Sequence, residues 1–248
     1  MVSPVLTVAI RTHNRAANIP PILHALNTQT AKDFPWEIVI IDNNSSDNTA
    51  QVIQNYNSHI PLRYIHEPIQ GAAIARRRAI KEAQSDLIAF LDDDNIPIHT
   101  WVQAVYNFSL SHPQAAAWGG INRPRFQTLP PEGFQHLHLY FALIDRGPKP
   151  LRYDPKRRIV PPGAGLVIRR PAWLAAVPAK PVLLGPTGAA IPTKGEDLEA
   201  LFHMSKAGGE IWYNPAMVLE HLIESDRLTP ITYSISAALS ASAATIYG

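Results

Sequence analysis

Apolar runs alternate with amphipathic segments throughout the first half of the chain. Four runs bounded by turn-forming residues have the length of buried strands: Val5–Ile10, Glu37–Ile41, Leu62–Ile65 and Leu87–Leu91. Apolar residues recur at helical spacing in the segments between them: Ile19–Leu26, Thr49–Tyr56 and Ala72–Ala83. This alternation is typical of α/β proteins with helices on both faces of a sheet. We therefore predict a Rossmann-like, doubly wound and mostly parallel sheet.

The second half is less regular, and we expect a smaller region of mixed structure there. Helices are predicted at Trp101–Leu110, Leu137–Ile144 and Asp197–Ala207, and short strands at Ala115–Trp118, Leu166–Ile168 and Glu210–Tyr213. Proline is frequent from Pro124 to Pro162, and Lys180–Lys194 is rich in proline and glycine, which favours loops. From Leu228 to Gly248 no residue is charged, and Ile231, Ile235 and Leu239 predict a weakly amphipathic helical tail.

Composition excludes several classes of function. The formal net charge of +2 does not suggest a nucleic-acid-binding protein. The absence of cysteine excludes disulfides, thiolate metal sites and a cysteine nucleophile. The first apolar run is too short for a signal peptide, and no stretch reaches the ~20 apolar residues of a membrane span. We expect a soluble, cytoplasmic chain; membrane association of the tail is possible, but no basic face supports it.

Three consecutive aspartates, Asp92, Asp93 and Asp94, follow the strand predicted at Leu87–Leu91. Ligands of open α/β sheets bind at the carboxyl ends of the strands. Adjacent carboxylates repel one another unless a cation or hydrogen-bond donors satisfy them. Mg²⁺ and Mn²⁺ prefer oxygen ligands and combine carboxylates with substrate phosphates. The triplet therefore favours a metal–phosphate site; the alternative is a solvated acidic turn that caps the following helix.

The turn after the first strand argues against a dinucleotide or P-loop site. Both sites need glycines there so that phosphates can approach the backbone. The first glycine of this chain is Gly71, and the turn reads Arg11–Arg15 with side chains throughout. A phosphate held here must be neutralised by metal and side chains instead, which agrees with the aspartates.

Three further features support a nucleotide site. Asp42 ends the second strand and can accept a hydrogen bond from a base or ribose, although a capping role in the turn is the alternative. Gly71 opens a helix that presents Arg76, and helix amino termini and arginine both attract phosphate. Glu196 and Asp197 lie at another predicted helix start, where the dipole favours acids and an ordinary cap is the simpler explanation.

The order of these segments resembles the family 2 glycosyltransferases of the GT-A fold. The similar segments are Val8–Arg15, Gln29-Thr30, Ile38–Thr49, Gly71–Ile80, Phe90–Asn95 and, more loosely, Pro162–Arg170, Gly195–Leu198 and His221. Each motif alone is weak, but their order is specific and covers most of the chain. The resemblance implies a metal-dependent, inverting transfer of a sugar from a nucleotide-diphospho-sugar. The expected donor is a UDP-sugar, and the expected acceptor is a hydroxyl of a saccharide or lipid-linked acceptor, in polysaccharide or glycoconjugate synthesis.

The resemblance also implies roles for single residues. It places the nucleotide beside Thr12, Asn14, Asp42, Arg76, Asp92 and Asp93. It makes Asp94 the direct ligand of Mn²⁺ or Mg²⁺, with His221 as a second ligand; the alternative is a structural histidine, which is the commoner role of a lone histidine. It makes Asp197 the catalytic base, with Glu196 orienting it or touching the acceptor. It assigns Gly163, Ala164 and Gly165 to a loop beside donor sugar and acceptor.

We expect one GT-A domain over residues 1–248. Residues 1–95 form the nucleotide-sugar half, 96–227 the acceptor and catalytic half, and 228–248 the helical tail.

Two other functions remain open. A nucleotidyltransferase making activated sugars would share the acids and basic phosphate site, but should carry a Gly-rich loop after the first strand. A non-catalytic nucleotide- or sugar-binding domain would not need both the acid triplet and Glu196-Asp197.

Overall fold

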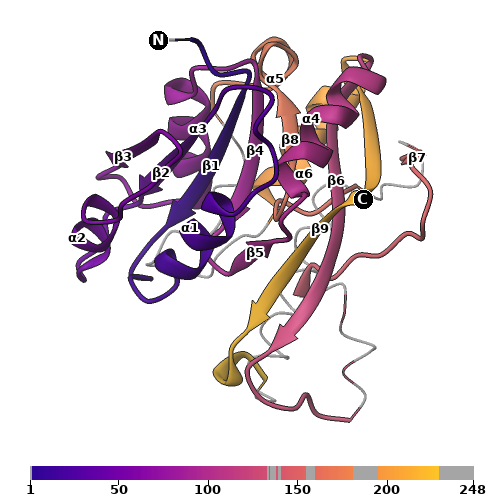
Figure 1. Cartoon of the computed structure of the whole chain (residues 1–248). Coiled ribbons are helices and arrows are strands. Elements are labelled where there is room, and N and C mark those ends of the chain that lie inside the picture. Colours follow the sequence, from indigo (N-terminus) through magenta and orange to yellow (C-terminus); the bar gives the residue numbers. More distant parts are fainter. Residues whose placement is uncertain are drawn as a thin grey trace.

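The computed structural model of the protein describes residues 2–132, 134, 138, 141–154, 160–180 and 195–228. Its first half contains the strands β1 (Leu6–Thr12), β2 (Trp36–Asp42), β3 (Leu62–His66) and β4 (Leu87–Asp92). The helices between them are α1 (Ile19–Asn27), α2 (Thr49–Gln54) and α3 (Ala72–Glu82). All four strands are parallel to their neighbours here, in the order β3-β2-β1-β4 (Figure 1). The predicted strand–helix alternation is confirmed within a few residues at each boundary.

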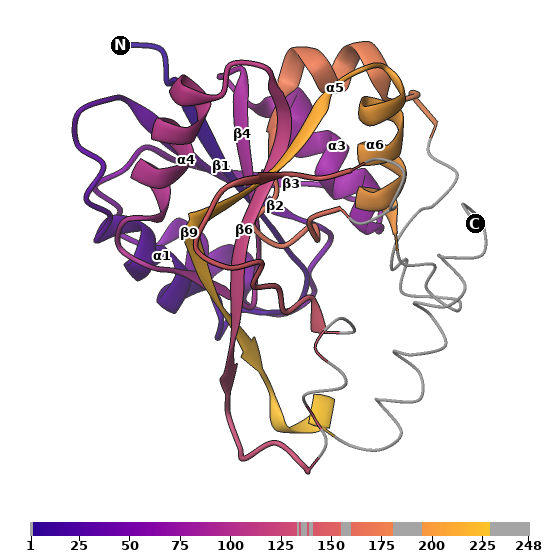
Figure 2. The same ribbon diagram turned by 90° about the vertical axis from the view of Figure 1, so that its right-hand side faces the viewer.

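Helices cover both faces of this sheet because alternate strand residues point to opposite sides. In β1, Leu6, Val8 and Ile10 belong to a core cluster with α1, α2 and α4 (Trp101–Ser111). Ala9 belongs to a second cluster on the other face, with α3, α5 (Arg170–Ala176) and α6 (Glu196–Lys206). Figure 2 shows the two sets of helices on either side of the strands. The doubly wound prediction is confirmed.

The second half extends the same sheet with strands of both directions. They are β5 (Asn95–Pro97), β6 (Ala115–Phe126), β7 (Leu151–Arg152), β8 (Val167–Arg169) and β9 (Glu210–Ile223), followed by the 3-10 helix η3 (Ser225–Leu228). The order continues β4-β8-β6-β9-β5, with β7 also on β9. β8 is antiparallel to β4 and β6, whereas β6 and β9 are parallel to each other. This is the predicted mixed region, joined to the parallel half through β4 and β8.

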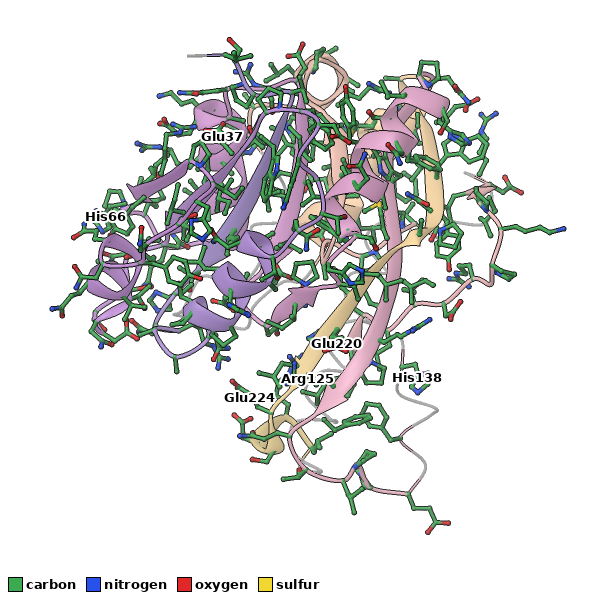
Figure 3. All side chains as sticks on the ribbon, in the orientation of Figure 1. Glu37, His66, Arg125, His138, Glu220 and Glu224 are labelled. Carbon is green, nitrogen blue, oxygen red and sulfur yellow. The ribbon has the colours of Figure 1, made fainter. Side chains whose placement is uncertain are left out.

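β6 and β9 are much longer than the short strands predicted at Ala115–Trp118 and Glu210–Tyr213. Beyond the body of the sheet they pair with each other in register, from Ile121 opposite Val218 to Phe126 opposite Ile223. The two strands project as a ribbon (Figure 1), on which Figure 3 labels Arg125 and Glu220. The sequence pattern missed this ribbon because its polar residues and Pro124 do not alternate as a half-buried strand does.

Two further differences concern the connecting segments. The helix predicted at Leu137–Ile144 lies partly outside the described residues, and its last residue, Ile144, instead forms a β-bridge with Asn122. Helix α5 was not predicted; it starts with Pro171 in its first turn, a position that proline tolerates. The predicted tail beyond Leu228 and the loop over 181–194 lie outside the described residues. Among the residues that are described, no helix is long and apolar enough to span a membrane.

Candidate functional site

The carboxyl ends of β1, β2 and β4 meet at one edge of the sheet. Thr12 lies opposite Asp42 in the β1–β2 register, and Arg11 lies opposite Asp92 in the β1–β4 register. These strand ends and the start of α3 surround a cavity of about 430 Å³. Its lining includes Thr12, Arg15, Asn43, Gly71, Asp92, Asp93 and Asp94. The structure thus brings three of the six predicted nucleotide residues, Thr12, Asp92 and Asp93, around one open space.

Arg11 connects the acid triplet to the amino terminus of α6. Its Nε donates to Asp92 Oδ1 at 2.7 Å, and its Nη1 donates to Glu196 Oε1 at 2.7 Å. Burial would raise the pKa of both carboxyls, but the Arg11 guanidinium outweighs it and lowers the pKa of Asp92 and of Glu196. Two acids from distant parts of the sequence are therefore held as carboxylates in one network.

The middle acid, Asp93, has a different environment. Its Oδ2 accepts a hydrogen bond from Thr12 Oγ1 at 2.8 Å. Burial and the neighbouring Asp94 raise the pKa of Asp93 to about 7, more than the Thr12 hydrogen bond lowers it. Thr12 and Asp93, both predicted to bind nucleotide, are thus bonded to each other on the cavity wall.

Asp94 and His221 face each other where β5 pairs with the outer part of β9. β5 pairs with β9 so that Asn95 lies opposite His221, and the Leu222 amide donates to the Asp94 carbonyl. His221 Nε2 lies 3.2 Å from Asp94 Oδ2, and His221 is buried. Asn95 Nδ2 donates to Asp94 Oδ1, which leaves Oδ2 facing the histidine. The structure therefore brings together the two predicted metal ligands, 127 residues apart in sequence.

The residues present fit a divalent ion that also binds phosphate. Within the described part of the chain, no group of three or more His, Asp or Glu side chains is arranged to hold an ion alone. Mg²⁺ and related ions commonly take one or two protein ligands and complete their shell with substrate phosphates and water. One carboxylate oxygen and one imidazole nitrogen, beside an open cavity, match that donor set.

Asp197, the predicted base, lies against the glycine loop. It follows Glu196 in the first turn of α6, whose N-cap residue is Gly195. Burial and the adjacent Glu196 raise the pKa of Asp197 to about 6, against the opposing effect of Arg76. A β-carbon on Gly163 would overlap Asp197 Oδ2 and Arg76 Nη2. Glycine at this position is therefore needed for the approach of the loop to the base.

Arg76, predicted to lie beside the nucleotide, is buried next to Asp197, and its role in nucleotide binding stays a prediction. Its side chain is 2% exposed, it lies over the Phe90 ring with Cζ 4.5 Å from the centroid, and its Nη2 is 3.6 Å from Asp197 Oδ1. No nitrogen of the guanidinium makes a hydrogen bond to the described residues. Its nearest carboxylate is that of Asp197, and it does not line the cavity between the strand ends.

Both carboxylate oxygens of Asp42 accept hydrogen bonds from other residues of the chain. Its Oδ1 accepts from the Ser45 amide at 2.9 Å and its Oδ2 from the Tyr64 hydroxyl at 2.8 Å, and the residue is 1% exposed. Its neighbour Asn43 lines the cavity instead and accepts from the Gly71 amide. Asn14, with φ of 53°, accepts from the Ser46 amide and organises the same turns. Nucleotide contact by Asp42 and Asn14 stays a prediction.

Sequence reasoning missed several residues of the site. Arg11 was part of a motif but received no role. Arg15 and Glu224, which form a bidentate ion pair at 2.9 and 2.8 Å, join the β1 turn to the end of β9. Figure 3 labels Glu224 at the end of the ribbon. Arg227, in η3, contacts both Asp94 and His221. Their basic or acidic character was visible in the sequence, but the oppositely charged partner of each lies more than 80 residues away.

The family model described as glycosyl transferase family 2 matches residues 7–172. The chain belongs to this family. Its match to glycosyltransferase AglE of Haloferax volcanii is 29% identical over 103 residues, covering 40% of this chain and 34% of that protein. Validoxylamine A glucosyltransferase of Streptomyces hygroscopicus subsp. jinggangensis is 34% identical over 104 residues, covering 41% of this chain and 25% of that protein. The match therefore spans about a third or less of these curated relatives.

Solved structures of glycosyltransferases share the fold. S. aureus TarS 1–349 with UDP-GlcNAc superposes with a TM-score of 0.59 at 15% identity, over 89% of this chain and 58% of that one. GalNAc-T7 with UDP, GalNAc and Mn²⁺ superposes with a TM-score of 0.64 at 16% identity, over 89% of this chain and 44% of that one. This family 2 chain therefore has the GT-A fold that its motifs predicted.

Proposed function

We propose that this chain is a metal-dependent, inverting glycosyltransferase that moves a sugar from a UDP-sugar to a hydroxyl of a saccharide or lipid-linked acceptor. The observation that carries the proposal is the Asp92–Arg11–Glu196 network. It holds the acid triplet of the cavity beside the start of α6, where Asp197 follows Glu196 directly. Donor-side carboxylates and a candidate base are thus parts of one connected site.

Asp197 is assigned the role of general base. An acceptor hydroxyl becomes an effective nucleophile when a carboxylate within hydrogen-bond reach takes its proton. The raised pKa of Asp197, about 6, suits this task, since the group is ionised near neutral pH and still basic enough to accept a proton. The hydroxyl oxygen then bonds to the anomeric carbon as the bond to the diphosphate oxygen breaks. Attack opposite the leaving group inverts that carbon.

The other side chains of the site position donor and base. Arg11 and Arg76 place positive charge next to Glu196 and Asp197 and oppose protonation of Asp197. Gly163 leaves the base free of side-chain contact on the loop side. Asp94 and His221 would hold Mn²⁺ or Mg²⁺, which when bound stabilises negative charge on the diphosphate leaving group.

The identity of the donor is supported by the structural relatives. The solved TarS structures contain UDP or UDP-GlcNAc, and the GalNAc-T7 structure contains UDP, GalNAc and Mn²⁺. We extend to this chain the uridine nucleotide and a divalent ion, and leave the sugar open. A saccharide or lipid-linked acceptor, and a role in polysaccharide or glycoconjugate synthesis, are part of the same proposal. The proposal also assigns residues 1–95 to donor binding and residues 96–227 to acceptor binding and catalysis, and it includes a cytoplasmic location.

A nucleotidyltransferase that makes activated sugars is the second candidate, since it would also use acids and a metal. Release of pyrophosphate from a nucleoside triphosphate and a sugar phosphate would establish it. A non-catalytic binding domain is the third, and the retention of Asp197 with a raised pKa speaks against it.

Calorimetric titration tests the proposal directly. UDP, GDP and dTDP are titrated into the wild type and into Asp94→Ala, each with Mn²⁺ and with chelator. We expect UDP to bind with Mn²⁺ and to lose at least tenfold in affinity when either the ion or Asp94 is removed. If no nucleotide binds in any condition, the transferase proposal fails. Arg125→Ala, on the exposed ribbon, is the control and should bind UDP as the wild type does.

A further inference from the structure

Three groups converge where the proposed metal would bind. Arg227 Nη1 lies 3.0 Å from Asp94 Oδ2 and 3.1 Å from His221 Nε2, and these two acceptors are 3.2 Å apart. A single cationic nitrogen therefore contacts both atoms assigned to the metal. The separation of 3.2 Å is near that of two neighbouring ligands of an octahedral ion at about 2.1 Å from each.

We propose that Arg227 occupies the metal position in the nucleotide-free protein and leaves it when metal and nucleotide bind. This inference rests on the metal site of the proposed function. An ion bound to Asp94 Oδ2 and to the Nε2 lone pair of His221 that faces Nη1 would overlap Nη1 at its present position. Two cations cannot share these ligands, so metal binding requires the guanidinium to move.

The ligands themselves are fixed by the backbone. Asp94 is held by the Leu222 amide on its carbonyl and by Asn95 on Oδ1, and His221 lies within β9. Arg227, in contrast, comes from a single four-residue turn, η3, and its side chain is 28% exposed. The movable partner of the three is therefore the arginine. A rotation of its side chain empties the position without disturbing the ligands.

The contact pattern also suits exchange with a metal. Because an arginine nitrogen can only donate, the tautomer of His221 with its hydrogen on Nδ1 is the one that satisfies the contact between Nη1 and Nε2. In that tautomer Nε2 presents to Nη1 the lone pair that a metal also needs. Phe141, with its ring centroid 5.4 Å from Arg227 Cζ, supports the guanidinium on another side. A released guanidinium needs a new anion, and the diphosphate that arrives with the metal supplies one.

The consequence is coupling between metal and nucleotide. When metal binds alone, the guanidinium of Arg227 loses its contacts with Asp94 and His221 and gains no new anion. When metal and nucleotide bind together, the guanidinium can contact a phosphate instead. The metal ion should thus bind weakly to the nucleotide-free protein and much more tightly when nucleotide is present. By thermodynamic linkage, the metal should raise the affinity for nucleotide by the same factor. Arg227 is the residue that sets the size of this coupling.

The test measures Mn²⁺ binding by electron paramagnetic resonance of the free ion, without nucleotide. We expect Arg227→Met to bind Mn²⁺ about tenfold more tightly than the wild type, because the ion no longer has to displace a charged hydrogen-bond donor from Asp94 and His221. Arg125→Met is the control: Arg125 lies on the same ribbon as His221, but its partner is the exposed Glu220 and it does not contact Asp94. The control should change Mn²⁺ affinity by less than threefold. Equal gains in both variants, or no gain in Arg227→Met, would overturn the proposal.

The same titrations are repeated with saturating UDP. For each protein, the Mn²⁺ dissociation constant without UDP is divided by the constant with UDP. This ratio should be smaller in Arg227→Met than in the wild type, by about the factor by which the variant binds Mn²⁺ more tightly without UDP. An unchanged ratio contradicts the proposal. If UDP does not bind the wild type at all, the proposed function fails, but the nucleotide-free titration still decides the role of Arg227.

A measurement on the wild type covers the case in which Arg227→Met does not fold. Mg²⁺ is titrated into nucleotide-free protein while the ¹⁵Nε resonance of Arg227 is followed by NMR. The resonance should shift with the same midpoint as Mg²⁺ binding measured by calorimetry. Binding of Mg²⁺ that leaves the Arg227 resonance unchanged would overturn the proposal.

Discussion

Gly163 lies so close to Asp197 that a β-carbon on the glycine would overlap the carboxylate Oδ2. The same β-carbon would meet Arg76 Nη2, which is itself 3.6 Å from Asp197 Oδ1. A loop from the middle of the chain and a helix start 34 residues later are therefore fitted to each other around the candidate base. Its position depends on the absence of a side chain in the loop.

Gly163→Ala should damage transfer more than binding. The added methyl group must push Asp197 or the loop aside, and a displacement of about 1 Å from productive geometry can lower the rate on the order of 100-fold. We expect kcat to fall 30- to 100-fold while UDP affinity changes less than threefold. Steady-state kinetics and calorimetry measure the two effects.

Gly208→Ala is the control for this variant. It introduces the same group at a glycine with open space around it, at φ of 91°, so only backbone strain is added. Its kcat should stay within threefold of the wild type. Equal kcat in the two alanine variants would contradict the tight fit between Gly163 and Asp197.

The pH dependence of kcat/KM should report the ionisation of Asp197. Its pKa is raised to about 6 by burial and by Glu196, and the base works only as the carboxylate. The rate should therefore be lost as pH falls through about 6, with a tenfold decrease per pH unit below that value. Asp197→Asn should lose roughly 10²- to 10⁴-fold in transfer and retain UDP binding. A flat profile down to pH 5 would exclude Asp197 as the base.

Arg11→Met should destabilise the protein, because it leaves Asp92 and Glu196 without their shared cation. Removing one member of a buried ion-pair network typically costs 3–5 kcal/mol; since Arg11 is 24% exposed, we expect roughly 3 kcal/mol, measured by urea unfolding. Without Arg11 the pKa of both acids should rise, so mild acidification should recover part of the loss. Arg125→Met, from the exposed pair with Glu220, should change the free energy of unfolding by less than about 1 kcal/mol.

Tyr64→Phe distinguishes two roles of Asp42. The substitution removes the donor to Asp42 Oδ2 and should cost about 1–2 kcal/mol of stability, because a buried acceptor loses its partner. Asp42→Asn should cost a similar amount of stability and should also weaken UDP binding, because the family resemblance implies that Asp42 contacts the nucleotide, whereas Tyr64→Phe should keep UDP affinity within threefold of the wild type. Unchanged UDP affinity in both variants would contradict that contact. A selective loss of UDP binding in Asp42→Asn alone would establish the base contact that the family resemblance implies.

The local pattern of the sequence predicted the parallel half accurately. Strand Leu87–Leu91 and its acids were visible because an apolar run ends abruptly at three carboxylates. The same rules failed for β6 and β9, whose outer halves are strands because they pair with each other and, in β9, also with β5. Residues such as Asn122 and Pro124 have no local preference for a strand that a sequence pattern could detect. Tertiary pairing overrides weak local preference there.

The sequence by itself determined the α/β class, the family motifs and the kinds of side chain available to the site. Those properties depend on residue type and on spacing within a few residues, which hydrophobic burial and backbone geometry translate directly into strands and helices. Only the tertiary structure decided the partners: Arg11 between Asp92 and Glu196, Arg227 between Asp94 and His221, and Gly163 against Asp197. Each contact joins elements far apart in sequence, and its distance is set by strand register and loop packing, which no local pattern records.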